Sequence, residues 1–92
     1  MQVHVKISQE NVNVDEVFTG ATADEVVGHV KARVARDVPF FLRPMVNGMS
    51  NLMFAQEVVR RYNTKTKQDL STPQSCDEFL TLAQQQGFAT VA

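Results

Sequence analysis

The sequence lacks the residues that the commonest chemical signatures require. Cys76 is its only cysteine, so an internal disulfide is excluded. Its four glycines stand well apart, and no GxGxxG or GxxxxGK[ST] phosphate loop is present. A disulfide framework and the common nucleotide-binding loops are therefore excluded.

Long apolar runs are also missing. The most apolar stretch, residues 38–49, contains two prolines, an arginine and a glycine, and it is far too short to span a membrane. The N-terminus alternates polar and apolar residues from its second position, which is not the pattern of a signal peptide. We therefore expect a cytoplasmic protein without a membrane partner.

Metal-binding and catalytic patterns are equally sparse. The candidate ligands His4, His29 and Cys76 fall on three different predicted elements, with no CxxC or HxxxH spacing. Two of the three carboxylate pairs, at residues 24–25 and 77–78, are explained by helix capping. The sequence predicts no metal, no cofactor and no enzyme. It leaves the role of Cys76 open beyond that of a partly buried thiol at a helix start.

What is present fits one small globular domain that covers residues 1–92. Hydrophobic residues make up 43% of the chain and charged residues 21%, which is ordinary for a folded protein. A chain of this size can bury a core, although not a deep one.

Periodicity predicts a sheet at the N-terminus. Residues 3–7 alternate apolar and polar side chains, as a strand with one buried face does. Residues 14–18 predict a second strand, with a break in the alternation at Asp15 and Glu16. The polar segment 9–13 is the turn of a hairpin, of open type. A short third strand is an option at residues 88–91.

Three helices are predicted from capping signals. Residues 22–25 and 75–78 match the capping box, and Ser50 or Asn51 can cap a helix between them. The first helix stops before Pro39, and the second gives way to a polar loop at residues 63–72. Gly87 suits a left-handed end to the third helix, followed by Phe88 in a Schellman motif.

These elements predict an α+β fold. An N-terminal β-hairpin, with or without a short C-terminal third strand, packs on about three α-helices. Residues 40–49 form either a short helix or an irregular segment, and the sequence does not decide whether they belong to the core or to an interface.

The first third of the chain resembles the strand–strand–helix start of ubiquitin-like β-grasp proteins. The resemblance rests on residues 1–6 together with Val30, Lys31 and Ala32 on the first helix. The chain departs from it afterwards, because residues 50–63 predict a helix where a β-grasp has strands. The C-terminus has no diglycine, so conjugation is not implied, and no family is assigned.

Charge is segregated along the chain. Residues 31–67 hold eight basic against two acidic residues, a net charge of +6, whereas residues 1–30 and 68–92 carry −4 and −3. On the first helix His29, Arg33 and Arg36 follow at i, i+4 and i+7 and share a face. Arg60 and Arg61 lie near the end of the second helix. Dipole stabilisation and plain solvation of helices explain such cations equally well.

The leading hypothesis is a non-catalytic protein-interaction or regulatory module that binds an acidic partner surface or associates with itself as a homodimer. Its partner-binding residues are expected to be His29, Arg33, Arg36, Arg60 and Arg61, with Met53 and Phe54 as apolar anchors if both are exposed. The alternative is nucleic-acid binding through the basic segment 31–67, which the near-neutral net charge of −1 disfavours.

Overall fold

The structure, a computed structural model, describes residues 1–9 and 12–92. Strands β1 (Gln2–Gln9) and β2 (Val12–Thr19) form an antiparallel hairpin, and β3 (Ala89–Val91) pairs antiparallel with the other edge of β1. The strand order is therefore β2-β1-β3. The predicted hairpin and the optional third strand are both confirmed. The type of the hairpin turn depends on residues 10–11, which lie outside the described residues.

The inner face of the sheet is set by alternation along β1 and β2. Val3, Val5 and Ile7 are buried in β1, as the period of two predicts. The expected break in β2 is seen in its burial: Val14 and Phe18 are buried, whereas Glu16 between them, opposite Val5 in the register, is exposed. Its carboxylate lies at the edge of the sheet and pairs with Arg33.

Three long helices begin where the capping signals predict. They are α1 (Ala23–Asp37), α3 (Asn51–Thr66) and α4 (Cys76–Gln86). The hydroxyls of Thr22, Ser50 and Ser75 accept hydrogen bonds from backbone N–H groups three residues on. In the two capping boxes the glutamate reaches one residue further back than the motif predicts, to the N–H groups of Ala21 and Gln74.

The C-terminal ends of α3 and α4 differ in how well the sequence predicts them. Gly87 adopts φ 85°, and the N–H of Phe88 donates to the carbonyl of Ala83, which confirms the Schellman ending of α4. The predicted loop from residue 63 is wrong at its start, because α3 continues to Thr66. It ends at Lys67, a non-glycine residue with φ 57°.

The segment that the sequence left open forms a protruding turn. A 3₁₀ turn, η1 (Phe40–Leu42), leads into the short helix α2 (Arg43–Gly48), so the structure has one helix more than the expected three. Of these nine residues only Val46 is buried. The Nζ of Lys31 on α1 donates to the carbonyl of Met49 at 2.8 Å and holds the end of α2 against α1.

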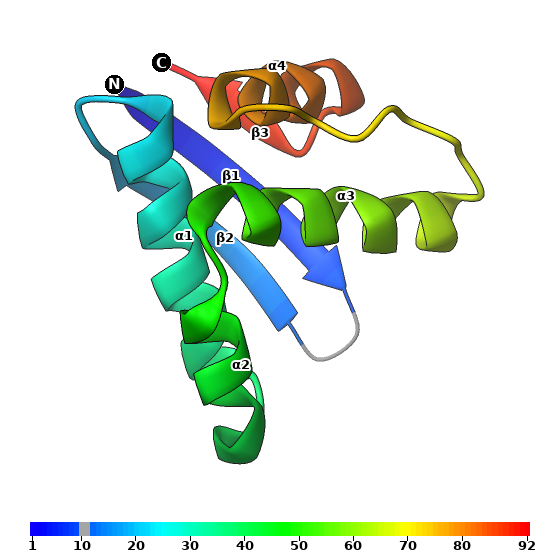
Figure 1. Ribbon diagram of the computed structural model, residues 1–92. Coiled ribbons are helices and arrows are strands. Elements are labelled where there is room, and N and C mark those ends of the chain that lie inside the picture. Colours follow the sequence, from blue (N-terminus) through cyan, green and yellow to red (C-terminus); the bar gives the residue numbers. More distant parts are fainter. Residues whose placement is uncertain (10–11) are drawn as a thin grey trace.

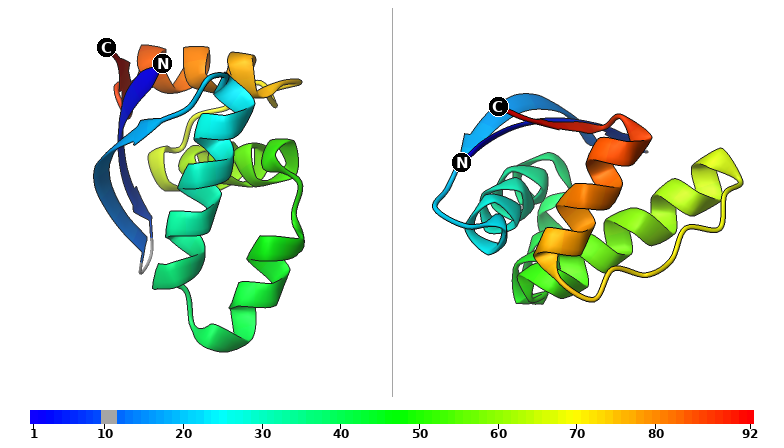
Figure 2. Two further views of the ribbon diagram at one scale, coloured as in Figure 1. Left: turned by 90° about the vertical axis from the view of Figure 1, so that its left-hand side faces the viewer. Right: turned by 90° about the horizontal axis from the view of Figure 1, so that it is seen from above.

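All the helices lie on one side of the sheet (Figure 1). Figure 2 shows the sheet as one layer and the helices as a second, with α1 and α2 extending together beyond the sheet. Buried residues of both layers form one apolar core, and no buried residue among those described is polar or charged. The strand that follows the helices, β3, is short and antiparallel to β1. The resemblance to a β-grasp thus remains limited to the opening ββα unit.

The N-terminal ends of three helices meet at Asp24. The side-chain amide of Asn51, at the start of α3, donates to the Asp24 carbonyl at 3.0 Å and to its carboxylate at 3.2 Å. The thiol of Cys76, at the start of α4, lies 3.6 Å from the other carboxylate oxygen. Gly28 admits this contact, because a Cβ there would approach the Asn51 amide to 3.1 Å.

Candidate interaction surface

One residue of the predicted basic face on α1, Arg33, is neutralised within the chain. Arg33 forms ion pairs with Glu16 of β2 and, at 2.8 Å, with Asp37 of α1. Hydrogen bonds to Asp37 first and then to Glu16 raise the pKa of the Arg33 guanidinium. Arg33 thus joins α1 to the edge strand of the hairpin.

The arginines of α3 are paired as well. Glu57 accepts hydrogen bonds from Arg60 at 2.5 Å and from Arg61 at 2.9 Å, one helical turn away. The hydrogen bond from Arg60 lowers the pKa of Glu57 most, and the hydrogen bond from Arg61 lowers it further. Beyond them, the ammonium of Lys65 donates to the carbonyl of Ser8 in the hairpin.

The structure does not gather the predicted basic residues in one place. Arg33 and Arg36 line a shallow hollow beside β2, Arg60 lines a second hollow beside residues 69–72, and Arg61 lines a third. His29 is exposed on α1. Within the described ranges, no carboxylate pairs with Arg36 or Arg43, and the Arg43 guanidinium donates to the Arg36 carbonyl at 3.4 Å. These two are the exposed arginines whose charge is least compensated.

Of the two predicted apolar anchors, one is exposed and the other is buried. Met53 is 57% exposed, whereas Phe54 is 4% exposed and belongs to the core. Successive residues of a helix point about 100° apart, and here that rotation turns Met53 to solvent and Phe54 to the core. The condition that both are exposed is not met, and Met53 alone remains on the surface.

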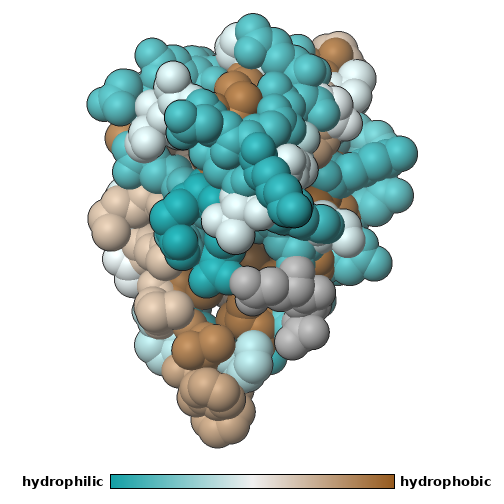
Figure 3. All heavy atoms as spheres, turned by 90° about the vertical axis from the view of Figure 1, so that its right-hand side faces the viewer, coloured by the Kyte–Doolittle hydropathy of each residue, from teal (hydrophilic) through white to brown (hydrophobic). Residues whose placement is uncertain are grey.

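The most apolar exposed feature is the end of the α1–α2 protrusion. Phe40 is 77% exposed, Phe41 69% and Met45 54%, and we name these three residues the apolar tip. The two rings stand edge to face, with centroids 6.1 Å apart and an interplanar angle of 86°. Figure 3 shows apolar side chains gathered at this lower end of the molecule, under a largely hydrophilic upper part.

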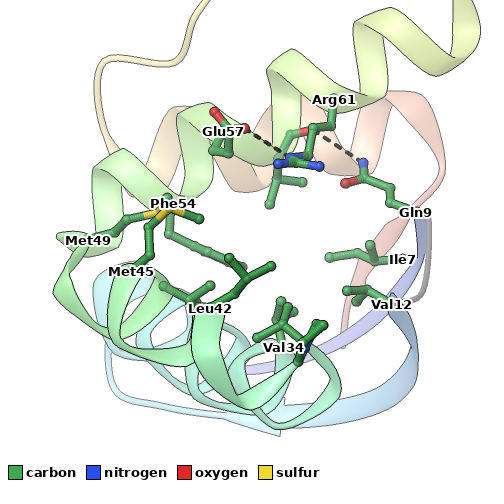
Figure 4. A pocket seen from close by; sticks show the side chains of 14 residues that line it. Ile7, Gln9, Val12, Val34, Leu42, Met45, Met49, Phe54, Glu57 and Arg61 are labelled. Carbon is green, nitrogen blue, oxygen red and sulfur yellow. Dashed lines mark hydrogen bonds and ion pairs between the residues drawn. The ribbon is translucent and has the colours of Figure 1, made fainter.

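A groove opens beside the apolar tip, between α2, α3, the end of α1 and the hairpin. It encloses about 210 Å³. Apolar side chains from all of these elements line it, among them Ile7, Val12, Val34, Leu42, Met45 and Phe54. Figure 4 shows its polar groups confined to one side, where Gln9 donates to the carbonyl of Val58 and Glu57 pairs with Arg61. We name this cavity the tip groove.

Sequence reasoning singled out residues 40–49 but could not place their side chains. A period of 3.6 needs a longer helix than six residues to define a buried stripe. The useful signal was the pair Phe40–Phe41 directly after Pro39 and close to Pro44, because two prolines this close leave no room for a long amphipathic helix. Such a pair belongs to a turn, and a turn lies on the surface.

The single cysteine is poorly suited to nucleophilic chemistry. Cys76 is 7% exposed, and burial, the hydrogen bond to Asp24 and the charges of Asp24 and Asp77 raise the pKa of its thiol to about 11. Neither histidine contacts it: His4 pairs with Asp15 on the outer face of the sheet, and His29 lies in solvent.

The described residues form neither a metal-binding cluster nor a membrane-spanning helix. Among residues 1–9 and 12–92, no three side chains of His, Cys, Asp or Glu stand close enough to hold a metal ion. None of the described helices has the length and apolar character needed to cross a membrane.

Comparison with known proteins finds no matching family model, no matching curated protein and no matching solved structure. Function is thus inferred from the surface itself.

Proposed function

We propose that this chain is a non-catalytic protein-interaction module that contacts its partner through the apolar tip. The observation that carries the proposal is the exposure of Phe40 and Phe41, 77% and 69%, at the end of a protrusion. Scattered exposed apolar side chains are ordinary, but a continuous apolar patch on a projecting element is typical of an interaction site. Aromatic residues and methionine are the residues enriched in such sites.

Burial supplies the driving force. Covering one phenylalanine side chain is worth roughly 1.5–3 kcal/mol, and the tip offers two of them beside a methionine. Their edge-to-face packing already limits their rotation, so less conformational entropy is lost when a partner covers them. Met45 adds a flexible side chain that adapts to the shape of the partner.

Charge gives the tip a second element of recognition. Arg36 and Arg43 flank it at the end of α1 and the start of α2, and both are exposed. Carboxylates of a partner would meet them at the rim of the contact, where they act mainly on association rate and specificity. The acidic-partner hypothesis therefore rests on these two arginines. Nucleic-acid binding loses support, because Arg33, Arg60 and Arg61 of its expected surface pair with carboxylates of the chain itself.

Site-specific photo-crosslinking tests the proposal. A benzophenone amino acid replaces Phe41 in the tip or, as the control, Val17, which is 61% exposed on the outer face of the sheet. In cells that produce the protein naturally, the tip probe should give discrete protein adducts, and substituting Phe40 by serine should weaken them. Equal labelling from both positions, or no adduct from the tip, would contradict the proposal.

A further inference from the structure

The tip groove has the size and lining of a site for an aromatic ring. An engineered apolar cavity of about 150 Å³ in another protein stays dry and binds benzene. The tip groove encloses about 210 Å³, enough for a phenyl ring together with its methylene group. Among its polar groups, the amide nitrogen of Gln9 is engaged with the carbonyl of Val58, and Glu57 is engaged with Arg61. An apolar occupant leaves these groups satisfied.

The ring and the groove lie next to each other on one surface. Phe40 and Phe41 do not line the groove, but Pro39 and Leu42, on either side of them in the chain, do. Met45 belongs to both features, since it is exposed at the tip and also lines the groove. A surface that carries a projection beside a matching cavity is complementary to itself. A two-fold axis between the two features brings each projection to the cavity of the other copy.

We propose that the occupant of the tip groove is the Phe40–Phe41 pair of a second copy of this chain. The inference rests on the proposed function and names its partner. One ring enters the groove of the other copy and its neighbour covers the rim. Because the same contact is made twice, the assembly closes as an isologous dimer and does not extend into a filament.

The exposed rings supply part of the area that a dimer of ordinary size buries. An aromatic side chain buries about 150–250 Å², so phenylalanines exposed by 77% and 69% offer roughly 220–370 Å² per copy. A standard interface buries about 800 Å² on each partner. The two rings alone provide between a quarter and a half of that area. The walls of the groove and Met45 would add to it.

Charge is balanced inside the groove but not around the tip. Among the described residues, the charged side chains that line the groove, Glu57 and Arg61, form an ion pair with each other, so these two present no net charge to a second copy. Arg36 and Arg43 do not line the groove. They flank the tip instead, so the apolar burial of the rings must outweigh the repulsion between these arginines of the two copies.

Sedimentation velocity over about 1 to 500 µM protein tests the inference directly. Wild-type protein should pass from monomer to dimer. The double variant Phe40→Ser/Phe41→Ser should stay monomeric over the same range, and the matched control Val17→Ser should behave as wild type. Circular dichroism checks that each variant is folded. A wild-type protein that stays monomeric throughout, or a double variant that still dimerises, overturns the inference.

A second pair of chains tests the groove separately from the tip. Val38→Phe enlarges a half-buried side chain at the groove wall and should weaken the dimer at least about tenfold although both tip rings remain. Mixed with the serine double variant, it should form a heterodimer, because one intact tip then meets one intact groove. Two results overturn the assignment of the groove. One is dimerisation of Val38→Phe at wild-type strength, and the other is a mixture of the two variants in which both stay monomeric.

The two proposals fail in different ways. If the crosslinked tip captures another protein while the purified chain remains a monomer, the interaction function stands and the second copy is excluded. Flotation of monomer with anionic phosphatidylglycerol vesicles, lost in the serine double variant, would assign the tip to a lipid surface and overturn both.

Discussion

Individual side chains here are explained by the partners that the fold supplies. Cys76 shows this most clearly, because a helix N-terminus by itself lowers the pKa of a thiol. Burial and the neighbouring carboxylates of Asp24 and Asp77 reverse that effect and raise the pKa from 9.0 to about 11. Folding therefore favours the neutral thiol. The stability that this provides is complete below pH 9 and is lost as the pH rises from 9 to about 11.

We expect the thiol of Cys76 to react slowly with iodoacetamide at pH 8. A pKa of about 11 in place of 9.0 leaves about one hundredth of the thiolate, so alkylation should be at least about 100-fold slower than in the unfolded chain. Mass spectrometry of timed samples measures the rate. The same protein in concentrated urea is the control, and equal rates in the two states would show that the thiol is neither buried nor neutral.

At the scale of elements, local sequence signals predicted where helices start better than where they end. Thr22, Ser50 and Ser75 each accept a hydrogen bond within their own segment, so sequence alone locates the three helix starts. The end of α3 was misplaced because its last turn is held by contacts that composition does not reveal. The amide of Asn63 bonds the backbone of Leu70 in both directions, across the turn that follows.

Two glycines of the helical layer should respond oppositely to alanine. Gly87 has φ 85°, so Gly87→Ala should destabilise the protein by about 1 kcal/mol even though nothing would touch the new Cβ. Gly48 ends α2 outside the left-handed region and also faces open space, and Gly48→Ala should be neutral or stabilise by up to about 1 kcal/mol. Urea unfolding measures both, and equal losses would exclude the left-handed end of α4 as the cause.

At the scale of the whole molecule, charge segregation along the sequence does not become charge segregation in space. The acidic hairpin and the basic second half of the first helix are brought together, and Arg33 pairs with Glu16 across the two layers. Helical spacing could have predicted the pairing of Glu57 with Arg60 and Arg61, at i+3 and i+4. It could not have predicted the Arg33 pair, which depends on the packing of a helix against a strand 17 residues away in the chain.

The apolar tip was only partly predictable from the sequence, because the two prolines indicate a turn but not how far its side chains are exposed. Phe40, Phe41 and Phe54 are chemically the same side chain, and which of them is buried depends on where α1, α2 and α3 cross. Only the tertiary arrangement sends the first two outward and the third into the core. The predicted fold class therefore held, while the candidate surface moved from the arginines to a protrusion that the sequence left open.

This shift of the candidate surface makes salt the decisive variable for the assembled molecule. Raising sodium chloride from about 0.1 M to about 1 M shortens the Debye length from about 10 Å to about 3 Å, which weakens any contact held by exposed charges. A dimer held by phenylalanine in an apolar groove should change its affinity by less than about threefold over this range. The matched variant Arg36→Gln/Arg43→Gln should show the same small response. A loss of tenfold or more in wild type, abolished in this variant, would place the contact on the two arginines beside the tip instead of on its rings, since only unpaired exposed charge is screened so strongly.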